Sequence, residues 1–251
     1  MDAWWSYRPS DLLMFSPAIY WRLFESLNRQ AWPFAVALLV AGVGIGWWWA
    51  RTAARTDAGS ARSWAFAYAV SARDLSLARA VSARGAVALM ALAWLWVTWA
   101  FFWQRFAPIN TAAEAFAWMF FAQGLGLVGL ALSPGLCWAP VRHGRTQVGL
   151  VLGAWALIGH PALAWVFGRP GIQAEWFGLA PDPSAIGALA LLLLLDAPGP
   201  LSRALWRALW ILPLVWCAIT SLTLWTLGEA QAWVVLALAG VALGAVALGR
   251  R

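Results

Sequence analysis

The sequence predicts an all-α, polytopic membrane protein with about seven transmembrane helices, and three observations carry that prediction. Of the 251 residues, 63% are hydrophobic and 11% are charged, whereas soluble domains average about 25% charged residues. Several stretches of 18 or more residues carry no charge, which is enough for a helix to cross a hydrocarbon core of about 30 Å. Tryptophan is in excess, with 22 residues, and clusters such as GWWW at 46–49 stand at the ends of apolar stretches. An aromatic belt at the headgroup level is the simpler interpretation of these clusters, and a ligand-stacking platform is the alternative.

The N-terminal segment, residues 1–30, is predicted to lie in the membrane interface. It lacks the basic start and the continuous apolar core of a cleavable signal peptide, so we expect it to remain in the mature chain. Its second half places apolar and polar residues on opposite faces at helical spacing, which predicts an amphipathic helix lying on the membrane surface. The apolar face of this helix consists of Tyr20, Trp21, Phe24 and Leu27.

Apolar windows separated by short polar segments predict seven spans. They are residues 31–50, 85–103, 114–133, 147–167, 184–197, 204–226 and 230–249. The fifth is short, because its roughly 14 residues are fewer than a straight span needs and the Pro-Gly-Pro at 198–200 ends it. Either this segment begins earlier in the chain or it enters the bilayer without crossing it.

Residues 51–84 form an arginine- and alanine-rich connector within a single membrane domain of residues 1–251, and we expect a helix in it from about 64 to 83. If all seven segments cross, 12 of the 17 arginines fall on the side of this connector, which the positive-inside rule assigns to the cytoplasm. The C-terminus is then cytoplasmic and the N-terminus outside. The twelve are Arg51, Arg55, Arg62, Arg73, Arg79, Arg84, Arg142, Arg145, Arg203, Arg207, Arg250 and Arg251.

The pattern of charges argues against a nucleic-acid partner. The formal net charge is +7, but the basic residues stand singly at the ends of apolar runs, where they suit lipid headgroups. The chain contains no lysine, which excludes Schiff-base chemistry. It also shows no HExxH, GxSxG, P-loop or paired-cysteine pattern. We therefore expect a non-enzymatic protein without catalytic residues, cofactor or metal ion, with the lipid bilayer as its surrounding partner.

His160 is the only histidine inside a predicted span. A transmembrane b-type haem needs two histidines at membrane depth, so we do not expect one. A single pigment or metal ion ligated by His160 is an open alternative. The simpler interpretation is a packing histidine that bonds a backbone carbonyl.

Three irregular segments fall on the predicted outer side: YRPSDLLMFSP, WQRFAPINTAAE and GRPGIQAEWFGLAPDPS. One interpretation is loop capping and ion pairing, with Asp182 capping a helix that has Pro183 at its first position. The other is an outward-facing polar pocket, in which two arginines hold an anionic group and an acidic residue balances their charge. The predicted ligand-binding residues are Arg105, Asn110, Arg169, Glu175 and Asp182.

Glycines four residues apart mark two candidate packing faces. Gly42 and Gly46 lie in the first predicted span, and Gly240 and Gly244 lie in the last. Small residues at this spacing let two helix backbones approach closely. The two faces either close the bundle between the first and last spans or meet other membrane subunits.

Four longer blocks also stand out: YRPSDLLMFSPAIYWRLFESLNRQAWP, WLWVTWAFFWQRFAPIN, GRPGIQAEWFGLAPDPSAIGALALLLL and LPLVWCAITSLTLWTLG. Their combination, which covers most of the chain, resembles a bacterial tryptophan-rich multi-spanning membrane protein family catalogued as a domain of unknown function. The insert at about 51–84 is longer than the connector of that family. The resemblance implies a helical protein of the bacterial inner (cytoplasmic) membrane and places Arg105 and Asn110 in the recurring core, but it implies no reaction or substrate.

Two functional hypotheses follow from these features. A small-solute permease or channel is favoured by the opposite charges on the outer side and by the short fifth span. A non-catalytic accessory subunit of a larger membrane complex is favoured by the two glycine faces and by the few ionisable residues deep in the spans. A membrane enzyme ranks third.

Overall fold

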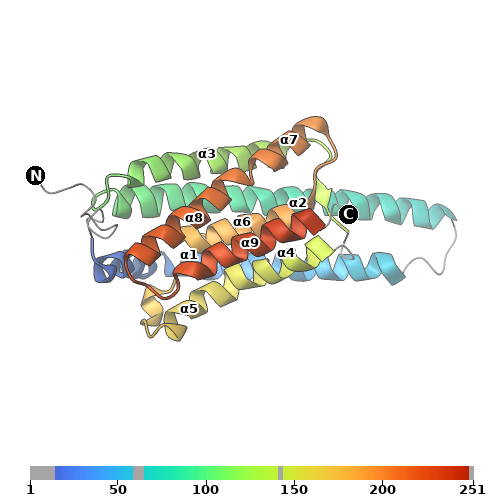
Figure 1. Cartoon of the computed structure of the whole chain (residues 1–251). Coiled ribbons are helices and arrows are strands. Elements are labelled where there is room, and N and C mark those ends of the chain that lie inside the picture. Colours follow the sequence, from blue (N-terminus) through green and yellow to red (C-terminus); the bar gives the residue numbers. More distant parts are fainter. Residues whose placement is uncertain (1–14, 59–64, 141–143, 249–251) are drawn as a thin grey trace, which may run out of the picture.

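The computed structural model describes residues 15–58, 65–140 and 144–248, and these residues form a bundle of helices (Figure 1). The first half contains α1 (Pro17–Ala58), α2 (Ala65–Val97), the π-helix η4 (Thr98–Phe106), α3 (Ala113–Leu132), β1 (Cys137–Trp138) and α4 (Gly144–Ala154). The second half contains the π-helix η5 (Trp155–Gly159), α5 (His160–Val166), the short η6 (Gly171–Gln173), α6 (Pro181–Leu194), β2 (Leu195–Asp196), α7 (Pro200–Ala208), α8 (Ile211–Thr226) and α9 (Ala232–Leu248). The all-α prediction is therefore confirmed for the described part of the chain.

Five helical stretches among the described residues are long and apolar enough to cross a membrane. They are Pro17–Trp47, Arg79–Phe106, Ala113–Leu132, Gly144–Val166 and Pro200–Thr226. The helices α6 and α9 are apolar but shorter, at 14 and 17 residues. Five of the seven predicted spans thus coincide with helices of full length, and the short fifth span coincides with α6.

The predicted interfacial helix and the first span form one continuous helix, α1, of 42 residues. The apolar face expected to meet lipid headgroups packs on protein instead, because Tyr20, Trp21, Phe24 and Leu27 are all buried. Its rings stack on η4: the ring centroids of Phe24 and Phe101 are 5.1 Å apart. Offset aromatic contacts of this kind stabilise the interface beyond the buried area alone.

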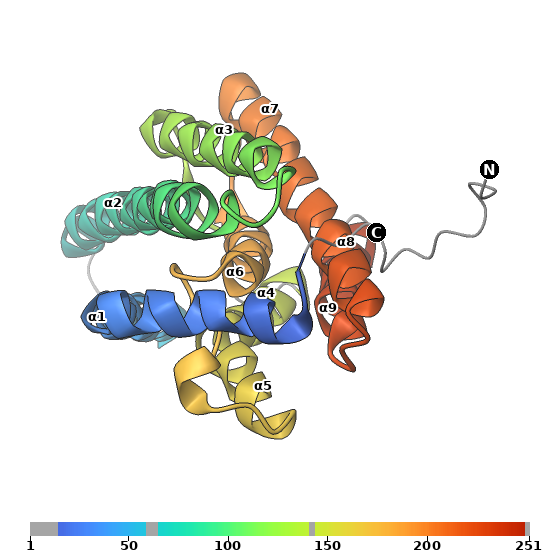
Figure 2. The ribbon, with the colours of Figure 1, turned by 90° about the vertical axis from the view of Figure 1, so that its left-hand side faces the viewer.

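The central element is α6, which the other helices surround in the end-on view (Figure 2). Every residue from Pro181 to Leu193 is buried. At a rise of 1.5 Å per residue, α6 is about 21 Å long, shorter than a hydrocarbon core of about 30 Å. Its C-terminal end continues into β2, which pairs with β1 in antiparallel register, Cys137 opposite Asp196. This pairing supplies backbone hydrogen bonds at the C-terminal end of α6.

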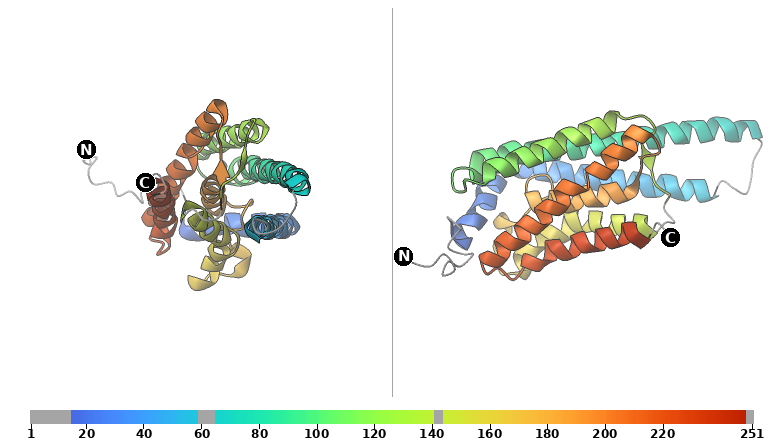
Figure 3. Two further views of the ribbon diagram at one scale, coloured as in Figure 1. Left: turned by 90° about the vertical axis from the view of Figure 1, so that its right-hand side faces the viewer. Right: turned by 45° about the horizontal axis from the view of Figure 1, so that its top comes forward.

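The two ends of the bundle differ. One end carries the start of α1, the η4–α3 connection, η6 and the α8–α9 connection, and we call it the proximal end (Figures 1 and 3). At the opposite, distal end, α1 and α2 project beyond the other helices and contain most of the arginine- and alanine-rich connector. The described start of α2 at Ala65 agrees with the helix expected from about 64. The predicted outer segment at residues 7–17 falls mostly outside the described residues.

The predicted closure of the bundle through paired glycine faces is wrong. A Cβ atom at Gly240 or Gly244 would meet no atom within 4 Å, so this face of α9 is open. Gly42 instead packs against Leu157, whose Cδ2 would lie 3.1 Å from a Cβ at that position, and Gly46 is also open. Helix α9 packs on α8, α4 and α6.

Candidate functional site

The first component of the site is the N-terminal end of α6. The chain enters this helix through Gly178, whose φ of +75° favours glycine, and through extended backbone at Ala180. The Ser184 hydroxyl accepts a hydrogen bond from the Gly178 amide at 3.0 Å and donates one to the Ala180 carbonyl at 2.7 Å. These contacts fix the turn, so that Asp182 enters the interior of the bundle at the start of α6.

Asp182 contacts α8 and does not cap its own helix, which corrects the capping role considered from the sequence. Its Oδ1 accepts a hydrogen bond from the Trp216 indole at 2.8 Å, and its Oδ2 accepts one from the Thr220 hydroxyl at 2.9 Å. The two donors are one helical turn apart on α8, so they lie on the same face. Both carboxylate oxygens are therefore held in a fixed orientation in the interior.

His160 reaches the same region from the opposite side. It begins α5 directly after the π-helix η5, and π-helical turns inside α-helices are frequent at functional sites. Its Nε2 lies 3.6 Å from the Glu175 Oε2. Neither ring nitrogen has a hydrogen-bond partner among the described residues, which contradicts the interpretation of His160 as a packing histidine bonded to a carbonyl.

Glu175 lies in the segment between η6 and α6, outside the apolar helices. The amide of Asn28 on α1 anchors this segment by donating to the carbonyls of Ile172 at 2.7 Å and Ala174 at 2.8 Å. Gln231 donates to the Glu175 Oε2 at 3.3 Å. Burial raises the pKa of Glu175, but the neighbouring His160 and Arg169 outweigh it, so its pKa lies below the ordinary value.

Arg169 lies between Glu175 and the first helix. Its Nη2 donates to the Gln231 side-chain oxygen at 2.6 Å and lies 3.9 Å from the Glu175 Oε2. Its guanidinium carbon lies 3.5 Å from the centroid of the Trp21 ring, a distance typical of a cation–π contact. The indole nitrogen of Trp21 in turn donates to Glu229 at 3.0 Å. Hydrogen bonds and ring contacts thus fix this arginine at the edge of the site.

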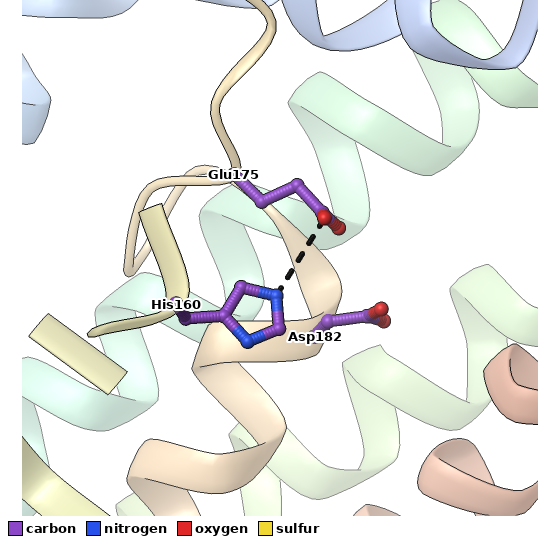
Figure 4. A group of neighbouring side chains, drawn as sticks. All are labelled: His160, Glu175 and Asp182. Carbon is purple, nitrogen blue, oxygen red and sulfur yellow. Dashed lines mark ion pairs between the residues drawn. The ribbon is translucent and has the colours of Figure 1, made fainter. Parts of the chain in front are cut away.

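His160, Glu175, Asp182 and Arg169 together form what we call the polar cluster; Figure 4 shows the first three, which enter one region from α5, the loop and α6. His160, Glu175 and Asp182 are each 1% exposed. One ligand atom from each of these three can be chosen so that all lie within 4.8 Å of one another. An imidazole nitrogen and two carboxylate oxygens are a donor set that suits divalent transition metals.

Arg105 and Asn110 lie outside the polar cluster. Arg105 donates to the Ser26 hydroxyl at 3.1 Å and to the Gln30 side-chain oxygen at 2.5 Å, and also to the carbonyl of Ala100. Among the described residues, Arg105 forms no ion pair with an acidic side chain. Asn110 accepts a hydrogen bond from the Ala112 amide at 3.0 Å, ahead of α3. The structure thus brings Arg169, Glu175 and Asp182 together, and it gives Arg105 and Asn110 local partners.

The sequence alone does not place His160 with the acidic residues, because the three positions follow no metal-binding spacing. The signal that could have found it is an ionisable side chain within an apolar span, which is a functional hypothesis by default. The donors Trp216 and Thr220 gave no signal of their own, because their role depends on how α8 packs against α6.

An apolar groove of about 390 Å³ on the flank of the bundle is separate from the polar cluster. It lies between α1, α2, α4, η5 and α6 and is lined by residues such as Gly42, Met90, Leu157, Phe177 and Leu191. None of the ionisable residues of the polar cluster lines it. Within the described residues, the polar cluster and this groove therefore lie in different parts of the bundle.

Comparisons of the chain with models of known protein families, with curated proteins and with solved structures gave no match.

Proposed function

We propose that this protein is a multi-spanning membrane protein that binds a small charged solute in the polar cluster and acts as a permease or channel for it. The observation that carries the proposal is the burial of His160, Glu175 and Asp182 in contact range of one another, with the Arg169 side chain only 9% exposed beside them. Ionisable side chains inside a membrane protein are energetically expensive and mark ion or substrate sites.

The length of α6 supports a transport role. Helix α6 is about 21 Å long, shorter than a hydrocarbon core of about 30 Å. The polar cluster occupies its proximal end, and an ion pair of Arg145 with Asp196 occupies its distal end. Irregular backbone at membrane depth is found where it is buried in protein or lines a polar path, and half-length helices of this kind form the solute sites of many transporters.

The charges of the cluster suit a charged ligand. Two carboxylates face one guanidinium and one imidazole, so the group combines a negative side with a positive side. Burial strengthens each of these interactions relative to water. A solute that enters therefore exchanges its hydration shell for fixed side-chain contacts.

The alternative function is a non-catalytic accessory subunit of a larger membrane complex. The open face at Gly240 and Gly244 on α9 favours it, because a helix of another subunit can approach closely there. A permease is expected to purify with a bound solute, whereas an accessory subunit is expected to purify with other membrane subunits.

Native mass spectrometry of protein extracted from its own membranes in mild detergent tests the proposal. We expect a monomer or homo-oligomer that carries a small bound mass, and we expect the substitution Glu175→Gln to remove that mass. Glu114→Gln is the matched control, because Glu114 is an exposed acid at the same end of the bundle. The released compound is then supplied to proteoliposomes, where wild-type protein should admit it and the Glu175→Gln protein should not. Co-purification with other membrane subunits in fixed ratio, without a bound mass, would establish the accessory function instead.

A further inference from the structure

We infer that His160, Glu175 and Asp182 form a binding site for a divalent transition-metal cation of the Zn²⁺ or Mn²⁺ type. This inference rests on the proposed function, because it names the class of solute that the polar cluster takes. It assigns a ligand to side chains that match no metal-binding motif in the sequence.

The geometry of the three donors supports the site. Ligand atoms at about 2.0–2.2 Å from one Zn²⁺ ion lie about 3–4 Å from one another. The available donor atoms of His160, Glu175 and Asp182 already lie within 4.8 Å of one another. Small side-chain rotations therefore bring all three to bonding distance without a change in the backbone.

The unpaired atoms of the cluster are an independent indication of a ligand. His160 is 1% exposed, yet its Nδ1 has no partner in the described parts of the chain, and its Nε2 has only the Glu175 Oε2 at 3.6 Å, beyond hydrogen-bond distance. The Glu175 Oε1 is also buried without a partner there. A buried polar atom left unpaired destabilises a protein. Coordination of a cation uses these lone pairs.

Hydrogen bonds from neighbouring side chains hold the two carboxylates in place, as hydrogen bonds to the ligands do in known metal sites. Trp216 and Thr220 orient the Asp182 carboxylate, and Gln231 orients the Glu175 carboxylate. Each of these hydrogen bonds uses one lone pair of a carboxylate oxygen and leaves other lone pairs of the carboxylate for a cation. Hydrogen bonds of this kind fix ligand orientation and strengthen metal binding.

The charge balance also fits a divalent cation. The two carboxylates supply two negative charges to match it, and a neutral imidazole completes the set. Arg169 is the competing cation, but it is also attracted by Glu229 and held by Gln231 and Trp21. It therefore keeps partners of its own when the carboxylates bind metal. Imidazole favours Zn²⁺ and related metals, whereas Mg²⁺ and Ca²⁺ prefer all-oxygen sites.

The test uses the full chain, purified in detergent through a tag that contains no histidine and stripped of metal with a chelator. Zn²⁺ and Mn²⁺ salts are the probes, and bound metal is counted by elemental analysis after desalting. We expect one equivalent of bound metal for wild type and for Glu114→Gln. We expect Glu175→Gln and Asp182→Asn to weaken metal binding by more than roughly 10- to 100-fold, the loss typical when a residue that only hydrogen-bonds a metal ligand is replaced.

X-ray absorption on the Zn²⁺-loaded wild type makes the test independent of how the variants fold. One nitrogen and two carboxylate oxygens at about 2.0–2.2 Å from the metal are expected, and a spectrum without histidine would overturn the inference. So would wild-type protein that shows its normal thermal transition but retains no metal above the buffer level. Metal that binds but does not enter proteoliposomes would contradict the permease and leave the metal site standing. A different solute bound to protein that retains no metal would contradict the metal site and leave the permease standing.

Discussion

Asn28 illustrates how a single buried polar side chain positions the site. It lies on α1 and has no charge, yet its amide group donates to two carbonyls on either side of Gln173. Those bonds anchor the segment that carries Glu175. Because the segment has no regular secondary structure of its own there, its backbone carbonyls depend on a side chain for partners. The position of Glu175 is therefore decided by a residue almost 150 positions earlier in the chain.

Replacement of Asn28 by leucine is expected to destabilise the protein by about 2 kcal/mol, because two carbonyls lose their donor while the side-chain volume is nearly kept. Thermal unfolding in detergent, followed by tryptophan fluorescence, measures this change. The neighbouring substitution Arg29→Ala is the control, since Arg29 makes only an exposed ion pair and such pairs contribute little. Equal melting temperatures for Asn28→Leu and Arg29→Ala would show that the segment is held by other contacts.

At the scale of elements, the contact between α4 and α6 fixes the central helix. A Cβ atom at Gly149 would lie 3.0 Å from the Leu193 Cβ and 3.1 Å from the Ala190 carbonyl oxygen. These distances leave no room for a side chain, so the backbones of α4 and α6 approach as closely as glycine allows. One turn further along α4, a Cβ at Gly153 would meet the Ala190 Cβ at 3.9 Å, an ordinary contact. Close approach is therefore confined to one position.

The substitution Gly149→Ala is expected to destabilise the protein by about 1–3 kcal/mol, because one methyl group overfills this contact. Gly153→Ala makes the same chemical change on the same helix and is expected to be neutral or slightly stabilising, since alanine favours the helix. Thermal unfolding of the two variants side by side measures the difference. A lower melting temperature for Gly153→Ala than for Gly149→Ala would place the tight contact elsewhere.

At the scale of the whole molecule, apolar side chains cover much of the outside, while three ionisable side chains, His160, Glu175 and Asp182, are buried inside. Large exposed hydrophobic residues occur on most of the helices, among them Trp32, Trp118, Leu132, Val166 and Trp233. Such a surface has no favourable partner in water and suits a lipid environment. The polar cluster is shielded from that environment by the helices around α6. The arrangement is therefore the one expected for a membrane protein with an interior polar site.

The orientation of the molecule in the membrane is predicted by its arginines. A fusion of alkaline phosphatase after Arg251 is expected to be inactive, because 12 of the 17 arginines fall on the side of the C-terminus if all seven segments cross, and that side is then cytoplasmic. A fusion after Glu229 is the matched control and should be active, since the α8–α9 connection lies at the proximal end. Enzyme activity in whole cells measures both. An active fusion after Arg251 with an inactive one after Glu229 would invert the topology.

The sequence by itself determined the helical membrane class, the places of most helices and the short fifth span. Helix α3 at Ala113–Leu132 almost coincides with the predicted 114–133, because apolar length and flanking polar residues are local properties that a window of sequence contains. The sequence also singled out Arg169, Glu175 and Asp182, because polar residues beside apolar spans are conspicuous in it. Only the tertiary structure decided that α6 is the buried axis, that His160 joins the two acids, and that Arg105 pairs with α1 instead. Those contacts join residues far apart in the chain, and the packing of whole helices determines which side chains meet.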